Sequence, residues 1–461
     1  MLYDGKKVLV LGFSLTGKKS AEYFIKNGAN VYISEYKEQL EKDREEIQKL
    51  QNLGVKIEFG GHSDEFIQNA DFAIISPSIK DDAPVLEKIN CPIYSDLEFV
   101  GKNLNYEDKM VLITGTNGKT TTTMLTSFVL TKKFSAPYVG NVGVPPLEVI
   151  EKKPDYLVVE ASSYQLHYSK NLKPYISILC NITPDHIAWH NGIEGYIKDK
   201  TDILKRADKN SYVILNYDDP YTKTFADDIK ANLYYFSLNK IDYENLCYLE
   251  NGSIYFKDEK IVDINEINLE GNHNYQNVMC AIIASKILGL DNETIKNAVK
   301  EFKAPSHRLE FIRKIGKTSY YNDSKATNPE ASNVAINSFP NKKVALIAGG
   351  RDKNTSLDEF AGYIKENIEK VVLIGEATER FKKALLNVGF NNIKEEKTLE
   401  LAIDEAAKDN PDVVLFSPAC ASFDMFDNFE ARGEAFREYV EKKWISEQLH
   451  GRRQLYNFTA G

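Results

Sequence analysis

The sequence predicts an α/β protein of several domains, each built on a largely parallel sheet with helices on its faces. Short apolar strands alternate with helical segments near the start of the chain, in its middle and near its end, and such alternation is typical of β-α-β units. The chain has 461 residues, which at about 150 residues per domain corresponds to three domains. The two observations together predict three sheets in succession.

The first domain is predicted to span residues 1–107. Its expected elements are strands at 8–11, 31–34 and 72–76, a glycine turn at 12–17 and a helix at 18–27. Short apolar runs that alternate with helices are typical of parallel strands buried on both faces. A polar stretch at 103–109 precedes the next strand, and we place the first boundary within it.

The second and third domains are predicted over 108–303 and 304–446. The elements expected in the second domain are strands at 110–114, 156–159 and 176–180, antiparallel strands within 231–268 and a helix at 279–288. The strands expected in the third domain lie at 344–347, 371–374 and 413–416. The last residues, 447–461, are polar and irregular in pattern, so we expect a frayed tail there.

Composition and charge exclude several classes of protein. Hydrophobic residues make up 43% of the chain and charged residues 27%, which is ordinary for a globular protein and excludes disorder. The net charge of −9 argues against a nucleic-acid-binding protein, which usually carries a basic face. No apolar run approaches the roughly 20 residues of a membrane span, and we recognise no signal peptide. Five scattered cysteines without a CxxC pair indicate reduced thiols in a cytoplasmic protein.

The clearest functional motif is a phosphate loop between an expected strand and an expected helix. Its residues are Gly115, Thr116, Asn117, Gly118, Lys119, Thr120 and Thr121. Glycines let backbone N–H groups face an anion, and a helix N-terminus adds partial positive charge. Lys119 can reach the terminal phosphates of a nucleotide, and the Thr120 hydroxyl can join a magnesium shell. The loop is tighter than the usual G-x-x-x-x-G-K-[ST] pattern, and the alternative is a glycine turn with an exposed lysine.

Three later residues have chemistry that suits a metal and phosphate centre. Glu160 ends an expected strand, and ligands bind at the carboxyl edge of a parallel sheet. His186 follows the strand that ends at Cys180, and Lys200 lies in an expected helix. Each has an ordinary interpretation as well, as a solvated carboxylate, a turn cap or a surface lysine. For Lys200, composition alone favours the surface, because lysines are rarely buried.

Several blocks of the sequence together resemble the Mur ligase family. The phosphate loop resembles the ATP loop of that family, and N-D-S-K-A-T-N at 322–328 is similar to the signature of its D-glutamate-adding branch. The other similar blocks are H-R-L-E at 307–310, G-N-H-N-Y-Q-N at 271–277 and S-P-A-C-A-S-F-D at 417–424. The blocks follow the family order between Gly12 and Phe429, so the resemblance covers nearly the whole chain.

The resemblance implies a fold and a reaction. The fold is α/β in three domains: a Rossmann-like N-terminal domain for a uridine nucleotide, a P-loop-type central domain for ATP and a Rossmann-like C-terminal domain for an amino acid. ATP would phosphorylate the alanyl carboxylate of UDP-N-acetylmuramoyl-L-alanine, and the amine of D-glutamate would attack the acyl phosphate. Such catalysis rests on positioning and charge neutralisation. We expect a cytoplasmic monomer that makes peptidoglycan precursors for cell-wall growth, cell shape and division.

The resemblance also implies roles around ATP. Lys119 and Thr120 would hold the β- and γ-phosphates and one Mg²⁺, which Glu160 would share. His186 would help to hold a second Mg²⁺, and Lys200 matches a lysine that carries a CO2-derived carbamate in this family, which supplies an anionic oxygen ligand. Lys119, His186 and Lys200 are therefore the expected catalytic residues. The further ATP contacts implied are Asn274 and Asn277 at the adenine, Arg308 at the phosphates and Asp323 at the ribose.

Further matches imply the substrate contacts. Those for the nucleotide sugar are Leu15 and Thr16 at the diphosphate, Glu35, Tyr36 and Lys37 beside the uracil, Ser76, and Asn141. Those for D-glutamate are Lys325, Thr327, Lys353, Ser422, Phe423 and Phe429. Two positions depart from the family, with Ser78 in place of the usual glycine and Ala188 in place of a frequent acid. If that acid supports the histidine in other family members, another group must support His186 in this chain.

Three alternatives remain at this level. A relative that adds lysine or diaminopimelate is the first, and the block at 322–328 argues against it. A nucleotide-regulated binding protein is the second, and it leaves Glu160, His186 and Lys200 unexplained. An NAD dehydrogenase is the third, because the turn at 12–17 follows a strand; however, Ser14 replaces the middle glycine of G-x-G-x-x-G, and no hydride-transfer site is evident.

Overall fold

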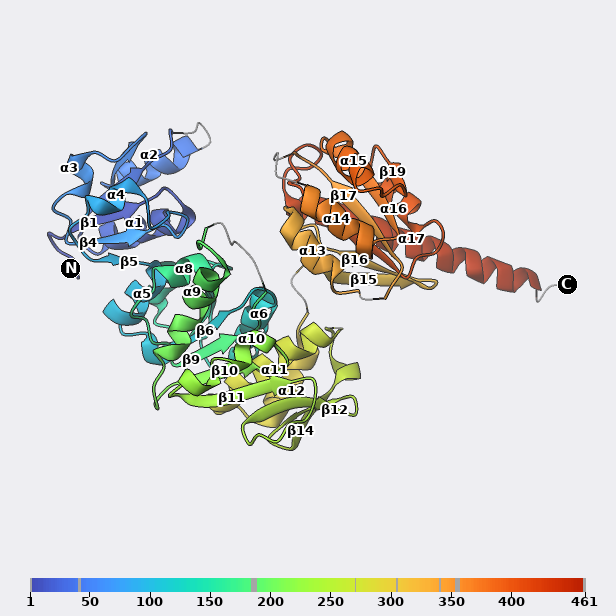
Figure 1. The fold of residues 1–461 in the computed structure, drawn as a ribbon, viewed down its shortest axis with the longest axis horizontal. Helices are drawn as coiled ribbons and strands as arrows, with labels where there is room; N and C mark the ends of the chain where they lie inside the picture. Colours follow the sequence, from blue (N-terminus) through green and yellow to red (C-terminus); the bar gives the residue numbers. More distant parts are fainter. Residues whose placement is uncertain are drawn as a thin grey trace. The chain divides into compact units, whose positions relative to one another are not determined.

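The computed structural model describes residues 2–39, 43–183, 189–269, 271–303, 306–339, 341–352 and 357–458. It divides into two compact units, which we describe separately: unit 1 comprises Met1–Lys303 and unit 2 comprises Ala304–Gly461. Figure 1 draws unit 1 from blue to yellow and unit 2 from gold to red. The expectations for His186, Ala188 and Lys353 fall outside the described residues.

Unit 1 begins with a five-stranded parallel sheet in the order β3-β2-β1-β4-β5. Its strands are β1 (Lys7–Leu11), β2 (Asn30–Glu35), β3 (Lys56–Phe59), β4 (Phe72–Ile75) and β5 (Ile93–Tyr94). Its helices are α1 (Leu15–Lys26), α2 (Arg44–Asn52), α3 (Asp64–Ile67), α4 (Pro84–Glu87), α5 (Asp96–Glu98) and a π-helix (Phe99–Asn103). The strand order reverses between β1 and β4, and such a switch point opens a crevice at the carboxyl ends of the strands.

A nine-stranded sheet follows in unit 1, in the order β14-β13-β12-β11-β10-β9-β6-β8-β7. Its strands are β6 (Met110–Thr114), β7 (Tyr138–Gly140), β8 (Leu157–Glu160), β9 (Ile176–Leu179), β10 (Tyr212–Asn216), β11 (Asn232–Ser237), β12 (Leu246–Glu250), β13 (Ser253–Phe256) and β14 (Glu259–Asp263). Its α-helices are α6 (Lys119–Leu130), α7 (Pro146–Val149), α8 (Ser163–His167), α9 (Ile193–Lys205), α10 (Pro220–Lys223), α11 (Asn272–Ile287) and α12 (Asn292–Glu301). β6 lies between β8 and β9 and is parallel to both, so the phosphate loop starts inside the sheet.

The expected antiparallel addition at 231–268 is only partly correct. β13 and β14 pair antiparallel, as expected. β11, however, pairs parallel to β10, and β12 pairs parallel to β11. For β11 the physical reason is the connection: α10 lies between β10 and β11, and a parallel partner needs such a crossover whereas an antiparallel one needs only a tight turn.

One hydrophobic core joins the two sheets of unit 1. Val8 and Val10 of β1 belong to a cluster that continues through Phe99 to Met110 and Leu112 of the second sheet. Polar contacts accompany this core, since the hydroxyls of Ser95 and Ser169 lie 2.7 Å apart. The two sheets therefore form one compact unit although the sequence marks a polar stretch between them.

Unit 2 holds a six-stranded sheet in the order β15-β16-β20-β17-β18-β19. Its strands are β15 (Glu310–Ile315), β16 (Thr318–Asn322), β17 (Val344–Gly349), β18 (Lys370–Ile374), β19 (Ile393–Glu395) and β20 (Val413–Phe416). Its helices are α13 (Pro329–Ile336), α14 (Asp358–Asn367), α15 (Thr378–Asn387), α16 (Leu399–Ala407) and α17 (Phe429–Phe458). Only β15 is antiparallel to its neighbour. Successive residues of β17 join two separate cores, so this sheet is covered on both faces.

The expected irregular tail at 447–461 is wrong for most of its length. Helix α17 continues to Phe458, and Figure 1 shows it in red running on toward the C-terminus. The segment contains two glutamines, two leucines, two arginines and one glutamate, which are good helix formers, and the glycine at 451 inside the helix costs only about 1 kcal/mol. Polarity was therefore a poor indicator of irregular backbone here.

The fold class expected from the sequence is confirmed, with largely parallel sheets covered by helices in both units. β6 and β20 have the bounds that the apolar runs predicted. Among the described residues, none of the helices combines the length and the apolar character needed to cross a membrane.

Candidate active site

The phosphate loop occupies the turn from β6 into α6. Gly115 has a φ of +146° and Gly118 a φ of +79°, which are conformations that L residues rarely adopt. A Cβ at Gly118 would lie 2.5 Å from Asn277 Oδ1, and one at Gly115 would lie 2.9 Å from Cys180 Cβ. Within the described part of the chain, no side chain accepts a capping hydrogen bond at the N-terminus of α6. The loop therefore presents a helix N-terminus, the arrangement that binds phosphate.

Lys119 folds back over this loop. Its Nζ donates to the carbonyl oxygens of Gly115 at 2.8 Å and Thr116 at 2.7 Å. Next to it, the buried hydroxyl of Thr120 donates to Glu160 Oε2 at 2.6 Å. The structure thus brings the expected phosphate lysine and the expected magnesium-binding hydroxyl and carboxylate together at the carboxyl ends of β6 and β8.

Glu160 is held from two sides. It is 1% exposed, and its second oxygen, Oε1, accepts a hydrogen bond of 2.6 Å from Nδ2 of Asn141. The backbone N–H of Asn141 also donates to the carbonyl oxygen of Glu160 at 2.9 Å. A hydroxyl and a carboxylate side by side are hard oxygen donors of the kind that Mg²⁺ takes from proteins, with phosphates and water completing its shell. The residues present therefore fit a magnesium ion.

Lys200 lies beneath the phosphate loop, not at the surface. It is 1% exposed, and its Nζ donates to the carbonyl oxygen of Gly115 at 2.8 Å. The same nitrogen lies 4.9 Å from the ring centre of Tyr196. Lys119 and Lys200 thus share one acceptor, so two cationic side chains converge on Gly115.

The two asparagines expected at the adenine lie at the start of α11. Asn277 Oδ1 accepts from the hydroxyl of Thr122 at 3.0 Å, and Asn277 Nδ2 donates to Asn274 Oδ1 at 3.2 Å. These bonds connect α11 with α6, whose first turn carries Lys119 and Thr120. The asparagines therefore lie beside the phosphate loop although about 155 positions separate them from it.

Sequence reasoning missed the segment that supports the phosphate loop from behind. Asn181 Oδ1 accepts from the backbone N–H of Asn117 at 2.8 Å, and its Nδ2 donates to the Asn117 carbonyl at 3.1 Å. The hydroxyls of Thr116 and Tyr196 lie 2.8 Å apart. Asn181 follows the end of β9 just as Glu160 ends β8. The position of polar residues after neighbouring parallel strands was the signal that could have identified it.

The residues expected at the uridine nucleotide gather at the switch point of the first sheet. Glu35, at the end of β2, accepts from the backbone N–H of Phe13 at 2.8 Å and of Lys37 at 2.9 Å. Ser14 caps α1, which begins with Leu15 and Thr16. The side chains of Leu15 and Tyr36 are exposed. Glu35 thus connects the turn after β1 with the turn after β2, and the exposed Leu15 and Tyr36 lie in or next to these turns.

Ser76 and Ser78 follow β4, the strand on the other side of the switch point. Their hydroxyls lie 3.2 Å apart, and a Cβ at Gly12 would lie 2.7 Å from Ser76 Cβ. The close backbone approach therefore occurs between Gly12 and Ser76, while Ser78 adds a hydroxyl where glycine is usual in the resembled family.

In unit 2, Asp323 anchors the loop that carries Arg308. It is buried, and its two oxygens accept from the backbone N–H of Leu309 at 3.0 Å and from the hydroxyl of Ser417 at 2.7 Å. Burial raises its pKa to about 7, although the two hydrogen bonds and the charge of Arg308 act in the opposite direction. Both carboxylate oxygens thus have protein donors, and Arg308 is partly exposed beside them.

The residues expected at D-glutamate occupy two neighbouring loops of unit 2. Lys325 Nζ lies 5.7 Å from the ring centre of Phe429, and Phe423 is 69% exposed while Ser422 is buried. The buried Arg432 joins these loops, because its guanidinium donates to Ser324 and to the carbonyl oxygens of Cys420 and Ala421. Thr327 is partly exposed at the end of the first loop.

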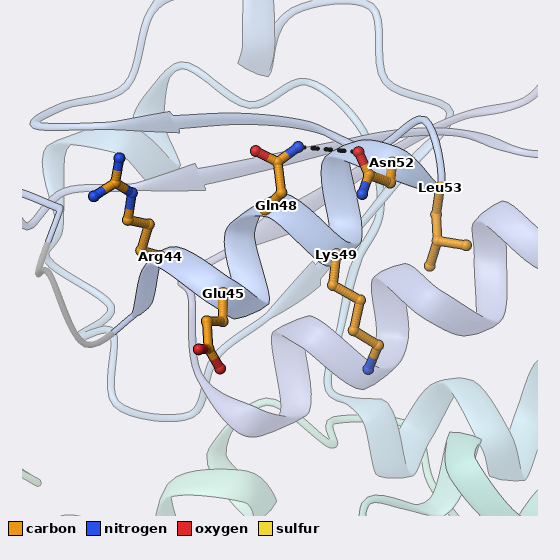
Figure 2. Close-up of a pocket in the computed structure, with 6 residues that line it drawn as sticks. All are labelled: Arg44, Glu45, Gln48, Lys49, Asn52 and Leu53. Atoms are coloured by element: carbon orange, nitrogen blue, oxygen red, sulfur yellow. Dashed lines mark hydrogen bonds between the residues drawn. The ribbon is translucent and has the colours of Figure 1, made fainter.

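A surface hollow on α2 contains none of these residues. It is lined by Arg44, Glu45, Gln48, Lys49, Asn52 and Leu53, all from one helix and the residue that follows it. Figure 2 shows their side chains spread along the helix, with one hydrogen bond of 3.0 Å from Gln48 to Asn52. Such a surface converges on no point, so the candidate active site is the one built around the phosphate loop.

Comparison with known families agrees with this arrangement. Residues 6–92 match the N-terminal domain of MurD-like Mur ligases, residues 113–285 the Mur ligase middle domain and residues 307–420 the glutamate ligase domain of Mur ligases. A UDP-N-acetylmuramoylalanine–D-glutamate ligase of Caldicellulosiruptor bescii is 36% identical over 95% of this chain and 98% of its own length. The chain belongs to the Mur ligase family. A Mur ligase of the same description from Clostridioides difficile is also 36% identical, over 95% of this chain and 98% of its own.

Solved Mur ligases share the fold. MurF of Acinetobacter baumannii has a TM-score of 0.56 at 16% identity and covers 93% of both chains. MurF of Thermotoga maritima, solved in complex with ADP, has a TM-score of 0.54 at 18% identity and covers 95% of this chain and 96% of that one. At these identities the likeness concerns the three-domain architecture alone.

Proposed function

We propose that this Mur ligase joins D-glutamate to UDP-N-acetylmuramoyl-L-alanine with the cleavage of ATP to ADP and phosphate, a step in peptidoglycan precursor synthesis. Similarity over nearly the full length to D-glutamate ligases supports the substrates. The observation that carries the reaction type is the phosphate loop with Lys119, Thr120, Glu160 and Lys200 gathered around it.

The reaction has two steps. An oxygen of the alanyl carboxylate attacks the γ-phosphorus of ATP, the bond from that phosphorus to the bridging oxygen breaks, and ADP leaves. The D-glutamate amine, after its ammonium form has given a proton to solvent, attacks the carbonyl carbon of the acyl phosphate. The nitrogen of the tetrahedral intermediate gives a second proton to solvent, and the intermediate collapses to the amide and expels phosphate. The protein contributes positioning and charge neutralisation among several anions.

The residues of unit 1 have separate tasks in this proposal. The Lys119 ammonium and the N-terminus of α6 neutralise the transferred phosphate. Asn274 and Asn277 orient the adenine, and Asn141 orients the substrate beside Glu160. Glu35, Tyr36 and Ser76 hold the uridine, with Leu15 and Thr16 at the diphosphate. Unit 2 binds D-glutamate in this proposal, through Lys325, Thr327, Ser422, Phe423 and Phe429. Arg308, also in unit 2, contacts the ATP phosphates.

We propose that this centre binds two Mg²⁺ ions. Thr120 and Glu160 would hold one of them, and a carbamate on Lys200 would hold the other together with His186. Bound magnesium would withdraw charge from the phosphate oxygens and orient them. The CO2-derived carbamate would turn a buried cation into an anionic oxygen ligand. Lys353, outside the described residues, completes the proposed D-glutamate contacts.

Each of the three domains is assigned one ligand, in the order of the sequence. We assign residues 1–107 to the nucleotide sugar, 108–303 to ATP and 304–446 to the amino acid. The enzyme would act as a monomer in the cytoplasm, and its product would serve cell-wall growth, cell shape and division.

The experiment that tests the function is an amino-acid panel. Purified protein is incubated with ATP, Mg²⁺ and UDP-N-acetylmuramoyl-L-alanine plus D-glutamate, L-glutamate, L-lysine or diaminopimelate, and amide product is measured by mass spectrometry. We expect product with D-glutamate alone. Absence of that product would contradict the proposal, and product with another amino acid would change the substrate.

A second measurement tests the carbamate. Activity of enzyme prepared free of CO2 should rise on addition of bicarbonate, because the carbamate forms reversibly on an uncharged lysine amine. Lys200→Ala should lose activity and the response to bicarbonate together. Undiminished ligase activity of this variant would contradict the carbamate on Lys200.

A further inference from the structure

A buried chain of hydrogen bonds connects the helix of Lys200 with the segment that follows Glu160. Asp199 Oδ2 lies 2.7 Å from His190 Nδ1, and His190 Nε2 lies 2.9 Å from Ser163 Oγ. Asp199 also bonds to His167 Nδ1 at 3.0 Å. The carboxylate of one residue of α9 therefore holds both ends of α8, Ser163 through His190 and His167 directly.

The His190 ring is tightly packed by its neighbours. Its side chain is fully buried, with the Tyr164 ring stacked at 5.5 Å and the Tyr196 ring edge-on at 5.3 Å. Gly195, in the first turn of α9, packs against the carbonyl oxygen of His190 so closely that a Cβ there would overlap it. A ring packed in this way holds Asp199 Oδ2 and Ser163 Oγ at a fixed separation.

The order of atoms, Ser Oγ to His Nε2 and His Nδ1 to Asp, is the order found in serine hydrolases. The surroundings argue against a nucleophile, because Ser163 is 2% exposed and a substrate cannot reach its hydroxyl. With Asp199 accepting from Nδ1–H, Nε2 of His190 accepts from the serine hydroxyl. The chain of bonds therefore holds structure in place and does not activate the serine.

The two ends of this series of hydrogen bonds lie close in sequence to two residues of the proposed metal centre. Asp199 directly precedes Lys200 in α9, and Ser163 comes three residues after Glu160, at the end of β8. Both oxygens of the Asp199 carboxylate are engaged with the two histidines.

We propose that Asp199 is a positioning residue for the metal centre, acting through His190 and His167 to fix Lys200 relative to Glu160. This inference rests on the proposed function, because it takes Glu160 and Lys200 as the residues that hold Mg²⁺. Supporting groups of this kind orient the ligands of a metal, and their loss typically lowers metal affinity about 10- to 100-fold.

The test compares Asp199→Ala with Asp202→Ala. Asp202 lies on the same helix and has an ion pair with Lys198 of 2.8 Å, so the control removes a paired carboxylate without touching the histidines. Mn²⁺, as a paramagnetic substitute for Mg²⁺, is titrated into enzyme with ADP and followed by electron paramagnetic resonance. Carbamate on Lys200 is followed by ¹³C NMR with labelled bicarbonate, and the melting temperature is recorded for each variant.

We expect the Mn²⁺ dissociation constant to rise about tenfold or more in Asp199→Ala and to stay within about twofold in Asp202→Ala. The carbamate signal should require more bicarbonate in Asp199→Ala only. The KM for D-glutamate, which unit 2 is proposed to bind, should not change. If Asp199→Ala does not fold, Asp199→Asn takes its place; it keeps one acceptor and should raise the constant several-fold.

Native Mn²⁺ affinity and carbamate formation in these variants would overturn the inference, even with a lowered melting temperature. Labelling of Ser163 by a fluorophosphonate probe would also overturn it, since a reactive serine is a nucleophile. Failure of the proposed function is a separate outcome: the wild-type protein would then give no amide product with D-glutamate. Metal binding with ADP is measured without either substrate, so the two failures are distinguishable.

Discussion

Asp323 illustrates how burial changes a single residue. Burial raises its pKa to about 7, whereas an aspartate in the unfolded chain has a pKa of about 4. Between these values the folded protein binds a proton that the unfolded chain does not. The contribution of Asp323 to the free energy of unfolding is therefore fully present below about pH 4 and is lost as the pH rises to about 7.

Asp323→Asn should remove this pH dependence. Relative to the wild type, the variant is expected to gain stability between pH 5 and pH 8, because an amide keeps an acceptor for Leu309 N–H without a charge. Calorimetric melting of both proteins at the two pH values measures the difference. Glu400→Gln, an exposed carboxylate of α16, serves as the control, and equal differences for Asp323→Asn at both pH values would contradict the assignment.

Residues of the candidate site could be predicted where the sequence pattern around them is sufficient. Lys119, Thr120 and Glu160 follow the ends of strands that the apolar pattern predicted, and they meet in the structure. The burial of Lys200 was not predictable from composition, because it depends on packing of α9 beneath the loop. Asp323 was expected at a ribose, yet both its oxygens have protein donors.

At the scale of the element, the phosphate loop depends on its backbone as much as on its side chains. Gly118 combines a φ of +79° with close approach to Asn277, so no other residue fits without strain. A side chain in the left-handed region costs about 1–2 kcal/mol, and the contact with the asparagine adds to that cost. The glycine therefore sets the direction in which α6 begins.

Gly118→Ala should weaken ADP binding at least about tenfold, since 1.4 kcal/mol corresponds to a factor of ten. Isothermal titration calorimetry measures the dissociation constant directly. The matched control is Gly362→Ala in the middle of α14, where a Cβ would have no atom within 4 Å; it should bind ADP normally. Native affinity in Gly118→Ala would contradict the loop geometry.

Helix α17 combines a packed part with a distal part. Phe436 and Val440 are buried in the core of unit 2, and Trp444 packs against it. The Phe436 ring is stacked on Phe416 at 5.0 Å. We therefore expect the first turns of α17 to carry its contribution to stability.

Truncation after Gln448 should leave the melting temperature and kcat at wild-type values, whereas Phe436→Ala should lower stability by about 3–5 kcal/mol. Thermal melting and steady-state kinetics of the two variants make the comparison. A large loss of stability on truncation would mean that the distal turns of α17 pack on the folded chain.

At the scale of the whole molecule, the proposed chemistry demands that ligands bound to different parts of the chain meet. ATP and the nucleotide sugar are assigned to unit 1 and D-glutamate to unit 2, and the amine must reach the acyl phosphate. The chain divides into its two compact units between Lys303 and Ala304. We therefore expect a ligand-dependent rearrangement at this connection, since closure of domains around ligands can complete an active site.

Small-angle scattering should detect this rearrangement. We expect the radius of gyration to fall when a non-hydrolysable ATP analogue, UDP-N-acetylmuramoyl-L-alanine and D-glutamate are added together, and to change less with any one of them. Identical scattering curves with and without the full set would exclude a large motion.

The sequence by itself determined the fold class, most strands and the phosphate loop, because apolar runs, glycines and the lysine that follows them act over a few neighbouring residues. It misjudged β11, where a crossover decides the direction of pairing, and the end of α17, where polar residues are also good helix formers.

Only the tertiary structure decided which distant residues meet. Lys200 reaches the carbonyl of Gly115 across 85 positions, and Asp199 reaches Ser163 through His190. Such contacts depend on the order of strands in the sheet and on the packing of α8 against α9. The physical reason is that a local pattern encodes the type of an element but not its neighbours, and the chemistry of this site lies between neighbours.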